Sequence, residues 1–288
     1  MQYHVNGRLV PAAEATVRVD DRGFRYGDAG FETCRAYGGT VFEWDAHRDR
    51  LVDTCETLGM DGAVPTNLRK RVAATLDAND LDDAYVRASV TRGVQTGKLT
   101  PDPEVEPTVV VVVKPLPRGG VDGRPVWDGP ASVRTVDRRR IPEASMPAAA
   151  KTHNYLDGVL ARLELRGTDA DEALVRDVEG DLAEGATSNV FFVTDSVLKT
   201  PALAGPILPG VTRRVVLDVA ATLDVPVETG RYGVDAVREA DEAFLTNTTW
   251  EVRPVATVDG QAVGGGPVTD RLAAAFDRRI ERDHYRSE

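Results

Sequence analysis

The sequence predicts a two-domain protein in which β-strands and α-helices are mixed along the chain. Its 288 residues are too many for one small hydrophobic core and suit two domains of ordinary size. Strand-like and helix-like patterns follow each other throughout, and the run 114–123 holds prolines and glycines that break regular structure. We therefore expect a smaller α+β domain over residues 1–114, an interdomain loop over 115–123 and a larger domain over 124–288.

Composition restricts the partners that this chain can have. A net charge of -11 argues against a nucleic-acid partner, because binding to phosphates needs a basic face. No apolar run reaches transmembrane length, and the N-terminal residues lack the pattern of a signal peptide, so we expect no membrane partner. Cys34 and Cys55 have neither metal-ligand nor disulfide-framework spacing, which predicts no metal site and a cytoplasmic location.

The N-terminal half begins with a predicted hairpin. Its turn is the pair Asn6-Gly7, which favours positive φ at both positions. Asp45 is predicted to be the N-cap of a helix that runs to about Met60, and a second helix follows over about 66–78. These elements favour a domain in which helices cover a sheet.

Two strands complete the predicted N-terminal domain. Residues 84–93 alternate, so that Tyr85, Arg87 and Ser89 share one face. The opposite face carries the apolar side chains Val86, Ala88 and Val90. The continuous β-branched run 109–113 predicts a buried strand.

The C-terminal half is predicted to open with a strand near 131–137 and a loop over 138–150. An amphipathic helix should follow Lys151, and its apolar stripe is expected to pack against a core; the stripe consists of Leu156, Val159, Leu160, Leu163 and Leu165. A strand over 172–177, a turn at Glu179-Gly180 and a second strand ending in the run 184–189 come next.

The remaining elements are a loop entering a helix near 207–220 and a strand that starts at Glu242 and leads into a hydroxyl-rich turn. A hairpin at Asp259-Gly260 and a closing amphipathic helix over about 268–284 follow. Free backbone N–H groups at the start of the helix near residue 211 offer a seat for a phosphate.

Lys151 is the candidate for covalent chemistry. The chain has only five lysines, and 35 basic residues less 5 leaves 30 arginines, so surface charge is supplied mainly by arginine. A retained lysine is therefore informative. A desolvated lysine can become the free amine that forms a Schiff base, whereas an arginine keeps its proton near neutral pH.

The order of motifs resembles that of the class IV aminotransferases. The resemblance covers residues 3 to 258 and is carried by Lys151-Thr-His-Asn-Tyr155, by the run 184–189 (EGATSN) and by the run 208–213 (LPGVTR). This family consists of the fold-type IV enzymes that use pyridoxal 5'-phosphate (PLP). It includes branched-chain and D-amino acid aminotransferases and aminodeoxychorismate lyases.

The resemblance implies a smaller α+β N-terminal domain and a larger C-terminal PLP-binding domain built on a β-barrel-like core with flanking helices. It also implies that Lys151 is the catalytic residue and forms the Schiff base. Glu184 would keep the pyridine nitrogen protonated, Tyr155 would bond the ring oxygen and Arg50, in the pattern HxxRL, would grip the phosphate. The other implied cofactor contacts are Gly210, Val211, Thr212, Asn247 and Thr248.

The predicted substrate contacts come from both halves of the chain; they are Tyr26, Phe31, Arg87, Arg92, Thr248 and Thr249. An anionic carboxylate needs a cation, and the strand over 84–93 offers two. Arg87 matches the Tyr-x-Arg position of branched-chain enzymes, whereas Thr91-Arg92-Gly93 is more similar to the D-amino acid and lyase members. The sequence therefore leaves the substrate open between these classes.

The resulting prediction is an aminotransferase that moves an amino group between an amino acid, branched-chain or D, and a 2-oxo acid such as 2-oxoglutarate. An aminodeoxychorismate lyase that releases p-aminobenzoate and pyruvate is the alternative on the same scaffold, and a non-enzymatic binding protein is the second alternative. The resemblance also implies a homodimer. Acidic excess with few lysines is typical of halophilic proteins, which gives a hypothesis about habitat.

Overall fold

The computed structural model describes residues 1–122 and 124–285 and divides the chain into two compact units. Unit 1 contains Met1–Val126 together with Ala150–Asn154 and the chain end from His284. Unit 2 contains Trp127–Ala149 and Tyr155–Asp283. The short segment with Lys151 thus belongs to the N-terminal unit although it follows the first strand of unit 2. The domain limits given above remain a prediction.

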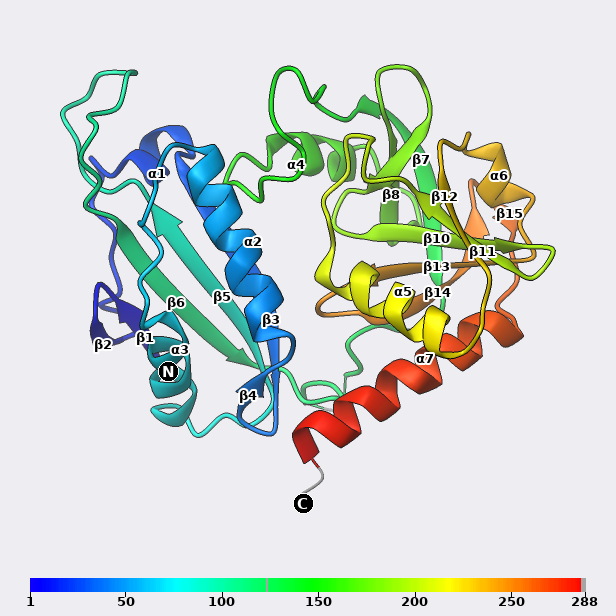
Figure 1. Cartoon of the computed structure of the whole chain (residues 1–288), viewed down its shortest axis with the longest axis horizontal. Coiled ribbons are helices and arrows are strands. Elements are labelled where there is room, and N and C mark those ends of the chain that lie inside the picture. Colours follow the sequence, from blue (N-terminus) through cyan, green and yellow to red (C-terminus); the bar gives the residue numbers. More distant parts are fainter. Residues whose placement is uncertain (123, 286–288) are drawn as a thin grey trace. The chain divides into compact units, whose positions relative to one another are not determined.

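Unit 1 is built on a six-stranded antiparallel sheet with the strand order β2-β1-β6-β5-β3-β4 (Figure 1). Its strands are β1 Gln2–Val5, β2 Arg8–Pro11, β3 Ala29–Tyr37, β4 Thr40–Val41, β5 Ala84–Thr91 and β6 Thr108–Pro115. The hairpin predicted at Asn6-Gly7 is confirmed, since φ is 47° at Asn6 and 89° at Gly7. The run predicted as a buried strand lies inside β6.

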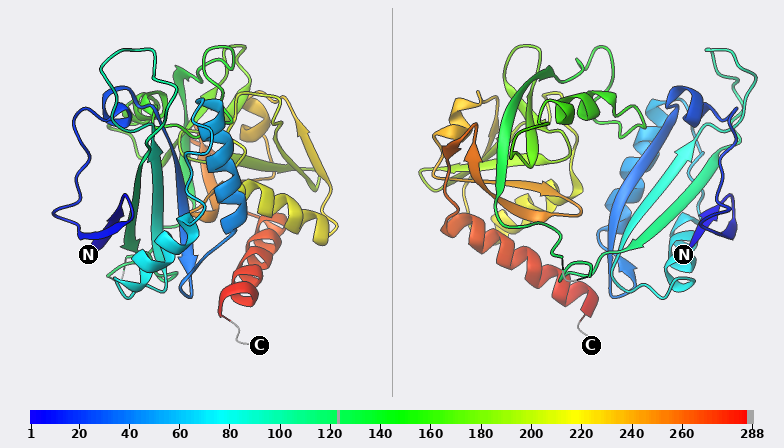
Figure 2. Two further views of the ribbon diagram at one scale, coloured as in Figure 1. Left: turned by 60° about the vertical axis from the view of Figure 1, so that its left-hand side comes forward. Right: turned by 180° about the vertical axis from the view of Figure 1, so that it is seen from behind.

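Two helices cover one face of this sheet. The helices of unit 1 are α1 Arg22–Tyr26, α2 Trp44–Thr57 and α3 Leu68–Asp77. Leu51 and Cys55 of α2 and Leu76 of α3 share one hydrophobic core with the inward residues of the central strands. The predicted alternation of β5 is confirmed, because Val86, Ala88 and Val90 point into that core. Figure 2 shows the strands of unit 1 from behind, with α2 on their far side.

The prediction for α2 was wrong at both ends. The helix begins at Trp44, with Glu43 at the N-cap position in a left-handed conformation, so Asp45 lies in the first turn instead of capping it. The earlier start buries Trp44 in the core. Asp45 still carries negative charge at the positive end of the helix dipole. The helix ends at Thr57, before Met60, and Gly59 follows with a φ of 65°.

Unit 2 is built on a curled nine-stranded sheet in the order β12-β11-β10-β13-β14-β7-β8-β9, with β15 paired to β14. Its strands are β7 Ala131–Arg139, β8 Glu172–Arg176, β9 Leu182–Gly185, β10 Asn189–Thr194, β11 Val197–Pro201, β12 Val227–Gly230, β13 Glu242–Asn247, β14 Glu251–Val258 and β15 Gln261–Ala262. β9 stands at one end of this strand order, yet it packs beside β10 and β11, which lie near the opposite end. This contact closes the sheet towards a barrel.

The turn before β10 corrects one predicted boundary. The sequence predicted a single strand ending in the run 184–189, whereas β9 stops at Gly185 and Asn189 opens β10. The bend has a physical cause, since the buried carboxylate of Glu172 accepts hydrogen bonds from the backbone N–H of Thr187 and from the hydroxyls of Thr187 and Ser188. The predicted hairpins at Gly180 and Asp259-Gly260 are present.

Helices surround this curled sheet (Figure 1). They are α4 Leu156–Leu163, α5 Val211–Thr222, α6 Asp235–Arg238 and α7 Pro267–Ile280, and α7 continues as a π-helical turn over Glu281–Tyr285. In the residues that the structure describes, no helix is both long and apolar enough to cross a membrane.

The predicted packing of α4 was wrong for most of its apolar stripe. Leu156, Val159 and Leu163 are 66%, 51% and 37% exposed. The face that packs against β7 and β8 instead presents Ala161, and Leu165 joins the same core just after the helix. The exposed stripe is thus left on the surface of the single chain.

Candidate active site

Lys151 is held in unit 1 by both the sheet and a helix. The segment 150–154 pairs with the start of β3, where the carbonyl oxygen of Lys151 accepts a hydrogen bond of 3.0 Å from Phe31 N–H. The backbone N–H of Lys151 donates to Thr54 Oγ1 of α2 at 2.9 Å. The side chain is half-buried, and its Nζ atom lies 4.5 Å from the centre of the Phe31 ring. The backbone of Lys151 is therefore fixed on β3 and α2, and its catalytic role stays a prediction.

Arg87 lies in the same group of side chains as Lys151. Its guanidinium carbon stands 3.6 Å from the centre of the Phe31 ring, and His153 meets that ring edge-on at 5.5 Å. His153 Nε2 is 3.2 Å from Ser89 Oγ. Burial and the charge of Arg87 lower the pKa of His153 to about 4, so that the imidazole is neutral near pH 7. The guanidinium of Arg87 and the amine of Lys151 thus both lie beside Phe31.

Arg92 is used in a different way. Its side chain is buried, and its Nε donates to Asp28 Oδ2 at 2.8 Å. Nη1 donates to the carbonyl of Gly59 at 3.0 Å, and Nη2 donates to the carbonyl of Leu58. These carbonyls follow the end of α2, so Arg92 ties the end of β5 to that helix. The guanidinium thus has a structural task in unit 1.

Arg50 is paired with a carboxylate that the sequence did not predict. Its Nε and Nη2 donate to the two oxygens of Glu32 at 2.7 Å each, and His47 Nδ1 lies 2.7 Å from Glu32 Oε2. Burial alone would raise the pKa of Glu32, but the charge of Arg50 and the hydrogen bonds lower it to about 2. Arg50 lies one turn before Thr54, the residue that anchors Lys151, so Arg50 and Lys151 are both held near the start of β3.

Tyr26 lies in another group of unit 1. The guanidinium carbons of Arg22 and Arg25 stand 5.0 Å and 5.1 Å from the centre of its ring. Its hydroxyl donates to the carbonyl of Gly97 at 3.3 Å. The substrate contact predicted for Tyr26 stays a prediction.

Glu184 is fixed in unit 2 by three donors. Its Oε2 atom accepts a hydrogen bond from Leu208 N–H at 3.0 Å and another from Asn189 Nδ2 at 3.1 Å. Its Oε1 atom lies 3.1 Å from Nη2 of Arg140. The carboxylate is buried on β9. The position and orientation of the Glu184 carboxylate are thus set by residues 140, 189 and 208, which come from three separate segments.

The start of α5 lies next to this carboxylate. Gly210 occupies the N-cap position, no side chain of the described residues caps the helix and its first turn carries no acidic residue. A Cβ atom at Gly210 would stand 1.9 Å from Asn189 Oδ1, so a larger residue there would displace the Asn189 amide. Asn189 therefore joins Glu184 to the helix start that contains Val211 and Thr212.

The hydroxyl-rich turn after β13 is organised by its asparagine. Asn247 Oδ1 accepts hydrogen bonds from the N–H groups of Thr249 and Trp250 at 3.0 Å and 2.7 Å. Asn247 Nδ2 donates to the carbonyl of Thr187, in the turn that joins β9 to β10. Asn247 thus shapes this turn, while the ligand contacts predicted for Asn247, Thr248 and Thr249 stay predictions.

Tyr155 stands at the start of α4, where its carbonyl accepts a hydrogen bond from Val159 N–H at 2.9 Å. The first turn of this helix also carries Asp157, whose Oδ2 accepts a hydrogen bond from Arg140 Nη1 at 2.6 Å. Since Arg140 also contacts Glu184, the first turn of α4 and the carboxylate of β9 are connected through one arginine.

The structure thus brings most predicted site residues into two groups. Unit 1 gathers Phe31, Arg87 and Lys151, with Arg50 one helical turn from the lysine anchor, and unit 2 gathers Glu184 with residues 210–212. Sequence reasoning did not assign four residues that hold these groups in place, namely Glu32, Arg140, His153 and Asn189. Only Asn189 and His153 stood inside a quoted motif.

Comparison with known proteins identifies the family of this chain. The family profile "Amino-transferase class IV" matches residues 29–258. A putative branched-chain-amino-acid aminotransferase of Methanocaldococcus jannaschii is 36% identical over 96% of this chain and 95% of its own. A D-alanine aminotransferase of Listeria innocua is 32% identical over 98% of this chain and 97% of its own. The crystal structure of a branched-chain aminotransferase from Thermoproteus uzoniensis superposes with a TM-score of 0.91, 29% identity and coverage of 99% and 96%.

The fold is that of an aminotransferase with the fold-type IV architecture. The chain belongs to the class IV aminotransferase family. The resemblance seen in the sequence, the predicted fold class and the predicted activity are confirmed.

Proposed function

We propose that this chain is a PLP-dependent branched-chain aminotransferase that passes an amino group to a 2-oxo acid such as 2-oxoglutarate. The observation that carries the proposal is the position of Arg87, which lies with Lys151 beside Phe31. Arg92, the cation expected for a D-amino acid or lyase enzyme, is engaged by Asp28 and by the end of α2. The apolar ring of Phe31 next to a cation suits an aliphatic amino acid.

The residues of unit 2 suit the cofactor. Among the described residues, the N–H groups at the start of α5 have no side-chain cap and meet no acidic residue in the first turn, as a phosphate requires. Thr246 Oγ1 is buried and has no hydrogen-bond partner among the described residues. Thr246 pairs with Asn189 across β13 and β10, so the two side chains share a face. A hydroxyl donor is thus available beside the helix start.

Each proposed role follows from the chemistry of a side chain. PLP, when bound, supplies an aldehyde carbon and an electron-withdrawing ring. Lys151 Nζ moves the proton of the substrate α carbon, and Glu184 holds a proton at the ring nitrogen. Residues 211 and 212, Arg50 and Thr248 bind the phosphate, and Asn247 orients the turn that carries Thr248. Tyr155 bonds the ring oxygen, and Arg87 with Thr249 binds the substrate carboxylate.

The test is an amino-donor screen with the purified protein and PLP. L-leucine, D-alanine and D-glutamate are offered with 2-oxoglutarate as acceptor, and a parallel assay follows release of p-aminobenzoate from aminodeoxychorismate. We expect L-leucine to be converted fastest and only in the presence of 2-oxoglutarate. Faster conversion of a D-amino acid, or release of p-aminobenzoate without an acceptor, would replace the proposed substrate.

Replacing Arg87 and Arg92 one at a time distinguishes their roles. Arg87→Gln is expected to raise KM for both the amino acid and 2-oxoglutarate about ten- to a hundredfold, as loss of a charged hydrogen bond of about 1.5–3 kcal/mol implies. Arg92→Gln is expected to leave KM within about twofold and to lower stability by about 2 kcal/mol, because it removes the donors on the carbonyls after α2. Steady-state kinetics and urea unfolding measure these effects, and a raised KM in Arg92→Gln alone would reverse the assignment.

We also propose that the enzyme is a homodimer. Leu156, Val159 and Leu163 recur on one side of α4 and are exposed, which is the pattern of a helix that packs against another protein. The proposed partner is a second copy, because the family resemblance implies dimers.

Val159→Asp together with Leu156→Asp is expected to convert the dimer to a monomer, since both charges would be buried in the interface. Light scattering after gel filtration should give 31.1 kDa for this variant and about twice that mass for the wild type. Leu203→Asp is the control, because Leu203 is also exposed, at 56%, but lies outside α4. Wild-type mass in the double variant would exclude α4 from the interface.

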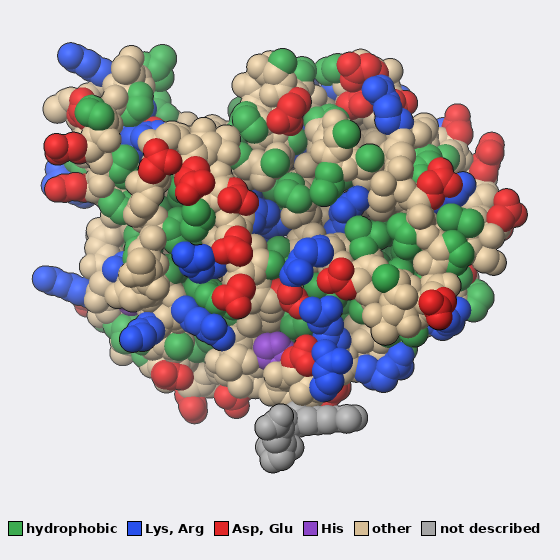
Figure 3. Space-filling view, viewed as in Figure 1, with side chains coloured by type: hydrophobic (Ala, Val, Ile, Leu, Met, Phe, Trp, Pro, Cys, Tyr) green, Lys and Arg blue, Asp and Glu red, His purple; other side chains and the backbone are tan. Residues whose placement is uncertain are grey.

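The acidic surface supports a salt requirement. Asp and Glu side chains are spread over both units on the face that Figure 3 shows, and the net charge is -11. Mutual repulsion of these carboxylates is screened by salt. We expect the melting temperature to rise by several degrees from about 0.05 M to 2 M KCl; a flat or falling curve would contradict halophilic adaptation.

A further inference from the structure

Arg140 follows β7 and uses its whole guanidinium group in contacts within unit 2. Nη2 lies 3.1 Å from Glu184 Oε1, Nη1 donates to Asp157 Oδ2 at 2.6 Å and Nε donates to the carbonyl of Pro206 at 3.3 Å. Its backbone N–H donates to the carbonyl of Arg176 at 2.8 Å. Three different segments thus meet at one side chain.

Arg140 is the charged member among the three donors named above for Glu184. The other two contacts come from a backbone N–H and from an asparagine amide, which are neutral. Arg213 is a second buried cation within electrostatic reach of Glu184, but its own hydrogen bond goes to the carbonyl of Pro201. Burial alone would lower the pKa of Arg140, yet the carboxylates of Glu184 and Asp157 raise it, so the group stays charged.

The contact matters because of what Glu184 is proposed to do. A buried carboxylate facing a ring nitrogen can share a proton in two ways, as carboxylate with protonated nitrogen or as carboxylic acid with neutral nitrogen. A fixed cation beside the carboxylate favours the first arrangement, since it stabilises the negative charge. The first arrangement is the one that makes the ring electron-withdrawing.

We propose that Arg140 is a positioning residue that keeps the Glu184 carboxylate ionised and fixed in orientation, and that through Asp157 it also locks the first turn of α4. This inference rests on the function proposed above, because it assigns to Glu184 the ring nitrogen of PLP. Arg140 acts through Glu184 and is not itself proposed to touch the substrate.

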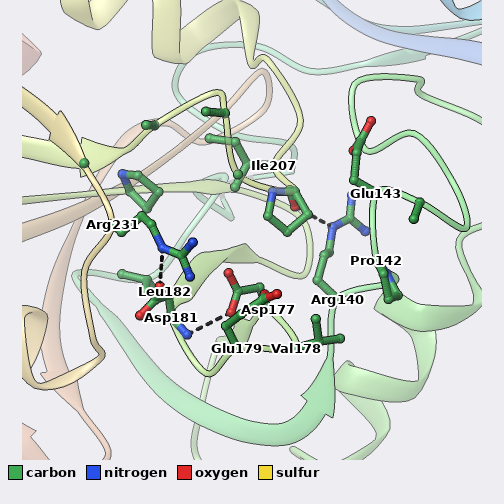
Figure 4. Close-up of a pocket in the computed structure, with 17 residues that line it drawn as sticks. Arg140, Pro142, Glu143, Asp177, Val178, Glu179, Asp181, Leu182, Ile207 and Arg231 are labelled. Atoms are coloured by element: carbon green, nitrogen blue, oxygen red, sulfur yellow. Dashed lines mark hydrogen bonds and ion pairs between the residues drawn. The ribbon is translucent and has the colours of Figure 1, made fainter.

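The far side of Arg140 forms part of a cavity of about 400 Å³ in unit 2 (Figure 4). Leu182, Pro206 and Ile207 supply apolar walls, and Arg231 lies on the side of the cavity opposite Arg140. Truncation of Arg140 would therefore join the space next to Glu184 to an open cavity. A small guanidinium ion is expected to enter this space and replace the lost group.

The first experiment is a double-mutant cycle on the PLP-loaded enzyme with L-leucine and 2-oxoglutarate. Arg140→Ala should lower kcat about ten- to a hundredfold with little change in KM, the range found for residues that orient the ligands of a reacting centre. In the Glu184→Gln background the same change should lower kcat by less than about threefold, because the carboxylate that Arg140 contacts is already gone. Equal losses in both backgrounds would overturn the proposal.

Methylguanidinium at millimolar concentration should restore part of kcat in Arg140→Ala and none in the wild type. The kcat of Arg140→Lys should lie between those of the wild type and Arg140→Ala, since one ammonium group cannot reach Glu184, Asp157 and Pro206 together. Arg231→Ala is the matched control, because Arg231 lines the same cavity, is exposed and pairs with Asp181. Arg231→Ala should keep wild-type kcat.

A readout that does not depend on turnover completes the test. The pH at which the visible absorption of bound PLP changes should move upward in Arg140→Ala, because loss of a cation raises the proton affinity of nearby groups. A purely structural role would lower the melting temperature and leave this pH unchanged, which would overturn the proposal.

If Arg140→Ala fails to fold, Arg140→Lys and Asp157→Asn replace it in the same measurements. An inactive wild type would reject the proposed function, whereas an active wild type with unaffected variants would reject only the role of Arg140.

Discussion

Replacing Lys151 with alanine is expected to reduce amino transfer more than about 10⁴-fold, because one change removes both the amine proposed to react with the cofactor aldehyde and the group proposed to move the substrate proton. Stability should change little, since the contacts that hold this segment to β3 and α2 are made by its backbone. Steady-state kinetics and thermal unfolding measure the two effects separately.

Borohydride reduction of the PLP-loaded wild type gives a direct test of the same residue. Peptide mapping should find the reduced adduct on Lys151 and on none of the other four lysines. Lys70→Ala is the control, because Lys70 lies exposed on α3, and it should keep full activity and full labelling at Lys151. Labelling of a different lysine in the wild type would remove Lys151 from its role.

The sequence predicted well those features that depend on local patterns. The turn pair Asn6-Gly7, the alternation of residues 85–90 and the position of the Lys151 segment before a helix all follow from residue types at short range. Long-range pairing was not accessible in this way. The pairing of residues 150–154 with β3, more than a hundred residues earlier, is set by tertiary contacts that no local pattern reports.

The failure for α4 shows a second limit. Leu156, Val159 and Leu163 have the spacing of a core-facing stripe, and the same spacing arises when a helix packs against another protein. A pattern indicates that a face is buried somewhere without indicating what covers it. The start of α2 was misplaced for a related reason, since the burial of Trp44 outweighed the capping preference of Asp45.

Among the site residues, those with a proposed chemical role stand in motifs, whereas the charged residues that hold them in place do not. Lys151 and Glu184 stand in motifs, and their chemistry is distinctive for a lysine and a buried acid. Glu32 and Arg140 act as partners of other charged groups, and in the sequence they resemble any surface acid or arginine. Their importance becomes visible only when distances and burial are known.

Glu32→Gln is expected to destabilise the protein by about 3–5 kcal/mol, because it leaves the buried guanidinium of Arg50 without its carboxylate. Urea unfolding at pH 7 measures the loss. Asp49→Asn is the matched control on the same helix, since Asp49 pairs with Arg48 at 2.9 Å but both side chains are largely exposed. The control should change stability by less than about 1 kcal/mol.

The pH dependence of this difference gives the sharper result. The pKa of Glu32 is about 2 in the folded protein and 4.5 ordinarily, a gap that corresponds to about 3 kcal/mol. Because the folded pKa is the lower one, this stabilisation is complete above pH 4.5 and is lost as pH falls towards 2. Burial lowers the pKa of His47 although Glu32 raises it, so protonation of this ring adds a loss of stability below pH 6.5 that should be at least as large in Glu32→Gln.

Wild type and Glu32→Gln should therefore differ most above about pH 4.5 and approach each other below about pH 3. A constant difference across this range would mean that the ion pair with Arg50 does not set the protonation of Glu32. In that case the loss in the variant would reflect packing around β3, and Arg50 would need no carboxylate to stay charged and in place for its proposed phosphate contact.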